Sequence, residues 1–448
     1  ADTPRPSGGA SRIFDFPMVP SQDPSSYRDA AVTQLFYLGN RFHDRLFALG
    51  FDEAAGNFQN VNFSGSGIAN DRIQADSQDG ISLSPPNANN ANFSTAGADG
   101  SAARVQMYIF TGSNPDRDGS FDGDIVYHEF AHGVSIRLHH GFGSTNIQSR
   151  GMGEGWSDYF GISLLAEASD DPSANYTTGG YTTYQLGGNT GYLTNYYFGI
   201  RRFPYSVNLN INPLTFADID VGQFAFPASV PVSPVISSSA ANANEVHNQG
   251  EVWCNALLEC RSALWNRDGF SANQLMMQLV IDGMKLSPAN PNFLQARDAI
   301  LQADLVDRAN ADRTELWTAF AKRGMGASAS SPASTTTSGV TEAYNLPFTA
   351  IFTYPDGIPT QLAPEATTVF RVQIAPDGLS LTADTAALLY SVDGGAPVTV
   401  ALTPTGTPDE YTATLPALGC SQRVDYTLRT GTSVGDVTSP GTGAYHAL

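Results

Sequence analysis

Lysine and cysteine are both scarce in this chain of 448 residues. Lysine occurs only as Lys285 and Lys322, and the 43 acidic residues outnumber the 23 lysines and arginines, which gives a net charge of −20. This balance opposes nucleic-acid binding, because phosphate recognition requires lysines and arginines, and it also opposes adsorption to anionic membranes. No apolar run reaches about 18 residues, so the sequence also lacks a membrane span.

The three cysteines, Cys254, Cys260 and Cys420, are too few for a disulfide-rich scaffold. Cys254 and Cys260 fall in one predicted helix, about 9 Å apart along its axis, whereas the Cα atoms of a disulfide lie within about 7 Å. Either one of them bonds to Cys420 or all three are buried thiols, and the odd count leaves at least one thiol free. We favour three thiols.

The pattern of apolar residues changes along the chain. Short alternating segments between Asn57 and Phe110 predict strands, including Val61–Phe63 and Arg104–Phe110. Apolar residues at helical spacing predict helices over 27–49, 245–265, 272–286, 292–303 and 312–323. From Thr349 onward, alternating segments between Gly, Pro and Asp turns predict an all-β immunoglobulin-like sandwich. A chain of this length exceeds one hydrophobic core, so we expect two or three domains.

The most informative stretch is Asp124–Gly133, which contains His128, Glu129 and His132 in the pattern H-E-x-x-H. Residues i and i+4 of a helix lie on one face, so both imidazoles can bind one tetrahedral Zn²⁺ while Glu129 faces the open coordination position. Bound Zn²⁺ lowers the pKa of water to about 7, and an adjacent carboxylate can take the proton. The pattern predicts Zn²⁺ held by His128 and His132, with Glu129 as general base.

A catalytic zinc site needs a third protein ligand. Glu154 lies in Gly151–Asp158, 22 residues after His132, and it opens a second apolar periodic segment. Asp158 follows four residues later on the same helical face, where it can accept a hydrogen bond from a zinc-bound imidazole. We therefore predict Glu154 as the third ligand and Asp158 as the acceptor that orients one histidine.

A longer zinc pattern would place a third histidine six residues after His132, at position 138. That position is Leu138, and His139 and His140 are out of register. We reject this arrangement and interpret both histidines as residues of a helix C-terminus.

Two further segments offer functional groups without a complete pattern. Asp116–Asp124 could supply oxygen ligands to Ca²⁺, but the spacing fits no complete binding loop, and the simpler interpretation is a turn in which Asp122 caps the helix. The Tyr-rich segment 173–239 contains Tyr192, Tyr196 and Tyr197, any of which could donate to an oxyanion, and Arg201 and Arg202, which could hold a substrate carbonyl.

Taken together, these motifs resemble the fungalysin family of secreted zinc metalloendopeptidases, which is related to thermolysin. The resemblance covers roughly residues 30–347 and is carried by Leu35–Leu38, Gly50–Phe58, Asp118–Gly133, Gly151–Asp158, Gly199–Ser206, His247–Trp253, Asp282–Lys285 and Ala321–Gly324. It implies two histidines and one glutamate as zinc ligands.

The resemblance also assigns roles that the spacing alone does not. His247, in the motif H-x-x-G-E-x-W, is similar to the histidine that donates a hydrogen bond to the tetrahedral intermediate. Asn90 and Ala91 resemble the edge-strand segment of thermolysin-like enzymes that pairs with the substrate backbone, and such pairing tolerates many sequences. Of the residues that the sequence alone suggested, we retain Tyr196 and Arg201 as substrate-binding candidates.

For the part of the chain that it covers, the resemblance implies a thermolysin-like two-lobed peptidase, and the β-sandwich predicted from the strand pattern would follow it, which gives an α+β fold overall. We expect a strand-rich N-terminal lobe over 1–120, a helical lobe with the zinc site over 121–347 and an accessory sandwich over 348–448. The expected protein is a secreted monomer that cleaves polypeptides broadly, with an apolar residue after the cut. It would be released from an inhibitory propeptide, and since residues 1–6 do not form a signal peptide, this numbering would describe the mature form.

Two alternatives differ in function. An aminopeptidase of the same ligand class typically carries a G-x-M-E-N segment, which this sequence lacks. A non-catalytic adhesion protein would hold structural zinc through four protein ligands, and no fourth ligand is evident. We therefore favour an endopeptidase.

Overall fold

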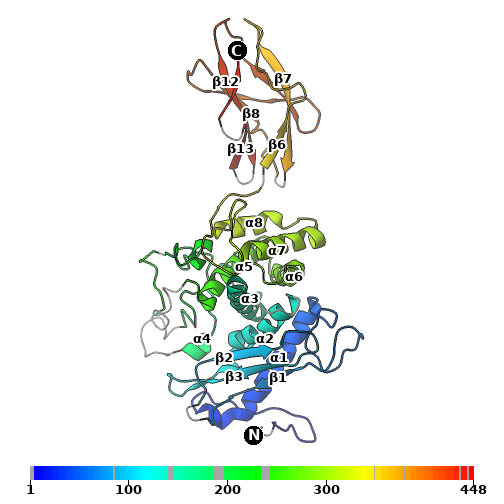
Figure 1. The fold of residues 1–448 in the computed structure, drawn as a ribbon, viewed down its shortest axis with the longest axis vertical. Coiled ribbons are helices and arrows are strands. Elements are labelled where there is room, and N and C mark those ends of the chain that lie inside the picture. Colours follow the sequence, from blue (N-terminus) through cyan, green and yellow to red (C-terminus); the bar gives the residue numbers. More distant parts are fainter. Residues whose placement is uncertain are drawn as a thin grey trace. The chain divides into compact units, whose positions relative to one another are not determined.

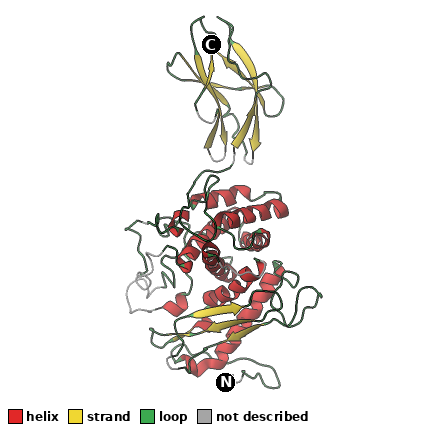
Figure 2. Cartoon of the chain, viewed as in Figure 1, coloured by secondary structure: helices red, strands yellow, loops and turns green. Residues whose placement is uncertain are grey.

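A computed structural model describes residues 5–83, 86–139, 146–184, 196–225, 227–233, 243–347, 349–377, 380–432, 435–440 and 443–448. The chain divides into two units, Ala1–Leu346 and Pro347–Leu448, and it mixes helix and sheet (Figures 1 and 2). Among the described residues, no helix combines the length and apolar character needed to cross a membrane.

The first unit begins with helix α1 (Arg28–Ala48) and a three-stranded sheet in the order β1-β3-β2. Strand β3 (Ala103–Met107) lies between β1 (Ile73–Asp76), which is parallel to it, and β2 (Ala91–Thr95), which is antiparallel to it. Strands β4 (Ile109–Phe110) and β5 (Arg117–Asp118) form a separate pair. The predicted helix over 27–49 is confirmed, whereas Val61–Phe63 forms no strand and Phe63 is 87% exposed.

The α-helices that follow in the described residues of this unit are α2 (Gly123–Leu138), α3 (Ile147–Leu165), α4 (Gly180–Thr183), α5 (Val246–Asp268), α6 (Ser271–Leu286), α7 (Phe293–Arg308) and α8 (Arg313–Lys322). The four helices predicted after residue 244 are confirmed to within a few residues. Local sequence favours both kinds of helix terminus. Asn292 and Gln295 form a capping box at the start of α7, and Lys322 lies in the last turn of α8.

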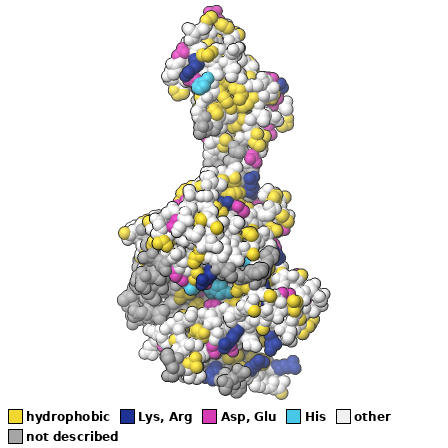
Figure 3. Space-filling model, viewed as in Figure 1, with side chains coloured by type: hydrophobic (Ala, Val, Ile, Leu, Met, Phe, Trp, Pro, Cys, Tyr) yellow, Lys and Arg dark blue, Asp and Glu magenta, His cyan; other side chains and the backbone are white. Residues whose placement is uncertain are grey.

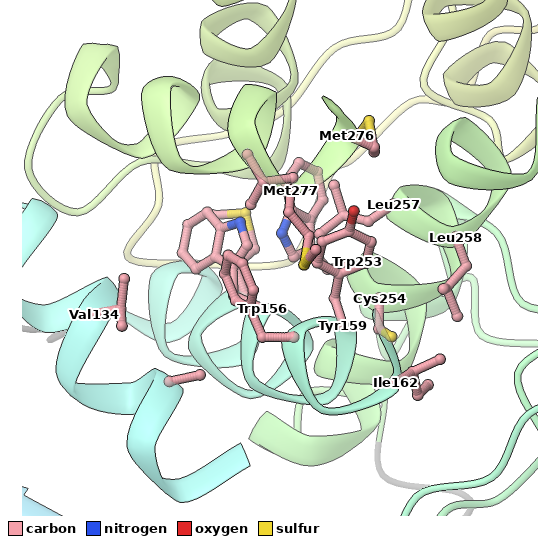
Figure 4. Close-up of a cluster of buried hydrophobic side chains, with 14 of the residues drawn as sticks. Val134, Trp156, Tyr159, Ile162, Trp253, Cys254, Leu257, Leu258, Met276 and Met277 are labelled. Atoms are coloured by element: carbon pink, nitrogen blue, oxygen red, sulfur yellow. The ribbon is translucent and has the colours of Figure 1, made fainter. Parts of the chain in front are cut away.

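Helices α3 and α5 pack closely at the centre of this unit. A Cβ on Gly155 would lie 2.6 Å from the carbonyl oxygen of Gly250, so the two backbones meet where neither has a side chain. Around this crossing, Figure 4 shows Trp156 and Tyr159 of α3 beside Trp253 of α5, and the two indole rings meet edge to face at 5.8 Å. This packing fixes the helix that carries Glu154.

The second unit consists of two sheets. One has the order β10-β11-β7-β6, formed by Thr403–Pro404, Glu410–Leu415, Thr368–Asp377 and Thr349–Thr353. The other has the order β13-β12-β8-β9, formed by Gly435–Ser439, Val424–Thr432, Ala387–Val392 and Val398–Ala401, with β14 (Tyr445–Ala447) also paired to β12. Residues from both sheets, including Phe370, Val372, Leu388 and Tyr426, form one buried cluster separate from that of the first unit.

The cysteines are all free, as expected. Cys254 and Cys260 are buried in α5, where α3 and α8 cover the helix, but Cys420 is exposed. The expectation that all three thiols are buried is therefore wrong for Cys420, which lies in a turn between β11 and β12.

Candidate metallopeptidase active site

Helix α2 places His128 and His132 side by side. Its N-cap residue, Asp122, makes no side-chain cap bond; its carboxylate instead accepts hydrogen bonds from the backbone and hydroxyl groups of Thr182, at 3.0 and 3.1 Å. Asp122 is thus the N-cap residue of α2, as expected, and its carboxylate also binds a tertiary partner. Further along the helix, the Nε2 atoms of His128 and His132 lie 3.1 Å apart.

Helix α3 brings Glu154 to the same point. Its Oε2 lies 3.1 Å from Nε2 of His128 and 3.5 Å from Nε2 of His132. Metal–ligand bonds of about 2.0–2.1 Å at tetrahedral angles put ligand atoms about 3.3 Å apart. The three protein atoms therefore form one face of a tetrahedron of the size that Zn²⁺ requires, and the residues fit this ion.

The other ring nitrogens of both histidines already have partners. Nδ1 of His128 lies 2.7 Å from Oδ1 of Asp158, and Nδ1 of His132 lies 3.3 Å from the hydroxyl of Ser157. A proton on Nδ1 of each ring, donated to these partners, would direct each Nε2 lone pair at the shared point, which is the tautomer that a metal ligand needs.

Asp158 is fully buried and strongly held. Arg201 donates to it from Nε at 2.6 Å and from a terminal nitrogen at 2.8 Å, and the hydroxyl of Tyr205 also donates to Oδ2. Burial alone would raise the pKa of Asp158, but the charges of Arg201 and His128 outweigh it and hold that pKa well below its usual range. The carboxylate is therefore ionised and fixed in direction.

The pKa shifts of the other residues in this cluster also follow from burial and from neighbouring charges. Burial raises the pKa of Glu129 to about 7 and lowers that of His132 to about 4. Burial also opposes the charge on His128, but Asp158 and Glu154 raise its pKa to about 10. Burial disfavours ionisation of Glu154 too, yet His132 and the hydrogen bond with His128 hold its pKa well below the usual value. A carboxyl group with a pKa near neutrality, such as Glu129, suits proton transfer.

His247 approaches this cluster from the start of α5. Its Nε2 lies 3.6 Å from Oε2 of Glu154, and its Nδ1 lies 2.7 Å from Oε1 of Glu245. The other oxygen of Glu245 accepts the backbone N–H of Asn248, so one carboxylate both caps α5 and orients the imidazole. Half of the His247 side chain is exposed, which leaves it accessible to a bound molecule.

These groups open into one cavity of about 830 Å³, and Figure 3 shows histidine side chains in a hollow of the first unit. Its lining combines β2 with the helices: Asn89, Asn90, Ala91, Asn92, Phe93, Phe110, Ile125, His128, Glu129, His132, Ser135, Ile136, Arg150, Gly153, Glu154, Ile200, Arg201, Glu245, His247, Asn248 and Glu251. Strand β2 is an edge strand, and Asn90 directly precedes it. Within the described residues, the outer edge of β2 therefore has no strand partner, and residues of β2 line the same cavity as the zinc-ligand cluster.

Two of the predicted substrate-binding residues have other contacts. Arg201 lines the cavity, but two of its nitrogens are taken by Asp158. Tyr196 stacks on Tyr184 with ring centroids 4.6 Å apart, and its hydroxyl accepts a hydrogen bond from Arg117. Tyr196 is not part of the described cavity lining, so we do not carry it forward as an oxyanion donor. Tyr192 lies outside the described residues.

Arg202, considered with Arg201, is also engaged elsewhere. It is fully buried and its Nε lies 3.1 Å from Oε2 of Glu251.

The sequence analysis missed both Tyr205 and Glu245. Tyr205 lies within the segment Gly199–Ser206 that carries the family resemblance, and Glu245 lies two residues before His247, so proximity to recognised motifs was the available signal.

His128, His132 and Glu154 are the only group of three or more candidate metal ligands among the described residues. Near the expected Ca²⁺ segment, Asp118 accepts bonds from Gln78 and from the backbone of Ser120, and Asp122 binds Thr182. These carboxylates serve local structure, and nothing in the described residues supports a calcium site there.

The family profile described as Fungalysin metallopeptidase (M36) matches residues 2–329, nearly three quarters of the chain. The chain belongs to the fungalysin family. Among curated relatives of this fungalysin, the extracellular metalloproteinase mep of Aspergillus fumigatus is 40% identical over 358 residues, covering 72% of this chain and 50% of that protein.

Two other relatives have similar names and coverage. Extracellular metalloproteinase 4 of Arthroderma otae is 40% identical and covers 71% of this chain and 46% of its own length, and extracellular metalloproteinase MEP of Neosartorya fischeri is 40% identical with 72% and 48% covered. This fungalysin therefore spans about half the length of these relatives. A solved engineered protein aligns with 43% of the chain at a TM-score of 0.16, too low to support an argument.

Proposed function

We propose that this fungalysin is a secreted, zinc-dependent endopeptidase that hydrolyses internal peptide bonds of proteins. The single observation that carries the proposal is the convergence of three zinc-compatible ligand atoms, a buried carboxylate and a half-exposed histidine in one cavity that is also lined by the edge strand β2. Export is supported by the relatives named extracellular metalloproteinases.

His128, His132 and Glu154 would hold the zinc ion. When bound, Zn²⁺ supplies a Lewis acid that polarises the substrate carbonyl and acidifies water. Asp158 fixes the ring of His128, and its own position is fixed by Arg201 and Tyr205. A carboxylate held by two donors cannot rotate freely, so the ligand geometry is set before substrate arrives.

Glu129 is the general base in this proposal. It lines the cavity and is 6% exposed, with no hydrogen bond or ion pair of its side chain among the described residues. It accepts a proton from the attacking water and delivers that proton to the leaving amine. His247, oriented by Glu245, donates a hydrogen bond to the oxygen that gains negative charge, a contribution of about 3–4 kcal/mol to barrier lowering in other enzymes.

The substrate would lie extended along β2, adding a strand through main-chain hydrogen bonds at Asn90 and Ala91. The position of β2 at the sheet edge and within the cavity lining supports this arrangement. Arg201 remains a candidate donor to a substrate carbonyl through its remaining nitrogen.

For the whole protein, we propose the thermolysin-like two-lobed arrangement, with lobes over 1–120 and 121–347 and an accessory immunoglobulin-like sandwich over 348–448. The common buried cluster of the two C-terminal sheets supports the sandwich. We further propose a monomer that acts on polypeptides with an apolar residue after the cut, and that a propeptide inhibits it until removal.

The first prediction tests this mechanism through Glu129→Gln. Removing the base while keeping the side-chain shape should leave zinc bound at one ion per chain and reduce kcat/KM by at least about a thousandfold. The substrate is an internally quenched peptide blocked at its N-terminus, which an aminopeptidase cannot cleave. The exposed Glu167→Gln serves as the matched control. Retained hydrolysis by Glu129→Gln would show that the base is misassigned.

A further inference from the structure

The charged side chains that line the cavity are nearly all paired. Glu154 contacts the two histidines, Glu245 contacts His247, Glu251 contacts Arg202 and Arg201 contacts Asp158. Glu129 is the proposed general base. Arg150 is the remaining ion of the lining, an exposed guanidinium on α3 with no ion pair among the described residues.

The residues outside the described ranges offer almost no acidic partner for Arg150. Segments 140–145, 185–195 and 234–242 contain no aspartate or glutamate, and the single acidic residue outside the described ranges is Asp2. Arg150 therefore lines the cavity with no ion pair among the described residues, in a chain that has 43 acidic residues and a net charge of −20.

The packing of α2 against α3 locates Arg150 along the cavity. The two helices run antiparallel, since a Cβ on Gly161 would meet the carbonyl of Asp124, and Asp158 pairs with His128. Arg150, near the start of α3, therefore lies at the C-terminal end of α2. Ser135 and Ile136, near that end of α2, line the cavity too.

The opposite end of the cavity is apolar. Ile125, at the start of α2, and Ile200 both lie against Gly179, 3.2 and 3.0 Å from where its Cβ would be. Ile125 and Ile136 are 11 positions apart in one helix, about 16 Å along its axis. The cavity thus has an apolar end and an end with one cation, with the zinc-ligand cluster between them.

Strand β2 sets the direction of a bound peptide. The backbone N–H of Asn89, which precedes β2, donates to the carbonyl oxygen of Ile109, close to the beginning of α2. Phe93, within β2, lies against Gly133, further along that helix. Strand β2 therefore runs from the apolar end toward the Arg150 end. A peptide added antiparallel, the commoner mode of pairing, enters the apolar end with its C-terminal residues and leaves its N-terminal residues beside Arg150.

We propose that Arg150 gives this enzyme a preference for an acidic side chain, aspartate or glutamate, on the N-terminal side of the scissile bond. One helical turn of about 5.4 Å separates Arg150 from Glu154, and extended residues are about 3.3 Å apart, so the second or third residue before the cut receives the preference. This inference rests on the proposed peptidase function and specifies its substrate class.

The test uses the zinc-loaded protein and N-terminally blocked peptides that differ only at one position before the cut, with the cut located by mass spectrometry. For wild type, kcat/KM is expected to be about tenfold higher for glutamate than for glutamine, and this ratio should decline as salt is raised. Arg150→Gln should bring the ratio near one, Arg150→Lys should retain part of it, and Arg150→Glu should favour lysine over glutamate.

The matched control is Arg41→Gln, which removes an exposed arginine of α1 outside the described cavity lining and should leave the ratio unchanged. A wild-type ratio within twofold of one at every position before the cut would overturn the proposal, as would a ratio that survives Arg150→Gln. If the wild type cleaves peptides but shows no acidic preference, the assignment of Arg150 fails and the proposed peptidase function stands. If wild type cleaves no peptide at all, the proposed function itself fails, and this inference with it.

Discussion

At the scale of single residues, the geometry of the site depends on the neighbours that hold each predicted metal ligand in place. Asp158 is buried and satisfied by three groups, His128, Arg201 and Tyr205, which come from α2 and from the segment after residue 195. A buried ion pair of this kind is costly to break, because the partner left behind is an uncompensated charge. Zinc affinity and local stability are therefore linked through one carboxylate.

This linkage predicts the effect of Asp158→Asn. Weaker orientation of His128 should lower zinc affinity about 10- to 100-fold, and the unpaired Arg201 should lower the free energy of unfolding by about 3–5 kcal/mol. Competition with a metal chelator measures the affinity, and urea denaturation measures the stability. Tyr205→Phe removes one donor without removing the charge and should show the same loss of affinity in weaker form. Unchanged zinc affinity in both variants would contradict the positioning role.

At the scale of secondary-structure elements, the decisive contact is the crossing of α3 and α5. A Cβ on Gly250 would lie 2.6 Å from Cβ of Glu154, and a Cβ on Gly155 would lie 2.8 Å from Cβ of Trp253. The helices that carry Glu154 and His247 thus approach through glycines. Their close contact is what sets the 3.6 Å separation between the Glu154 carboxylate and the His247 ring.

Gly155→Ala tests this crossing. In an ordinary helix interior, replacing glycine by alanine stabilises by about 0.5–1 kcal/mol. Here the added methyl group has no space, so we expect destabilisation by about 1–3 kcal/mol, with reduced zinc binding because Glu154 is displaced. Urea denaturation measures the first effect and metal analysis the second. Gln274→Ala at an exposed position of α6 should change stability by less than about 0.5 kcal/mol. A stabilised Gly155→Ala protein would rule out the tight crossing.

At the scale of the whole molecule, the two units have separate hydrophobic cores. The second unit buries Phe370, Val372, Leu388 and Tyr426 among its own strands, and it contains no member of the buried cluster of the first unit. A core that is complete within one stretch of chain is the condition for independent folding.

We therefore expect residues 347–448, expressed alone, to fold. The fragment should give a β-rich circular dichroism spectrum and one cooperative thermal transition. The same fragment with Leu388→Asp, which puts a charge in its core, is the control that should not fold. An unfolded or aggregated wild-type fragment would mean that its stability depends on the first unit.

The sequence by itself determined those features whose physics is local. Helical periodicity places His128 and His132 on one face, and apolar spacing predicts α1 and the helices after residue 244, because these depend on residues within a few positions of each other. The family resemblance added His247, which no spacing rule singles out.

Only the tertiary structure decided the contacts between distant segments. Asp122 binds Thr182 from the N-cap position of α2, Tyr196 lies on Tyr184 rather than in the cavity lining, and Arg150 lines the cavity with no ion pair in the described part of the chain. Side chains in loops, and charges whose partners come from other elements, depend on how helices and strands pack. The periodicity of one segment contains no information about that packing.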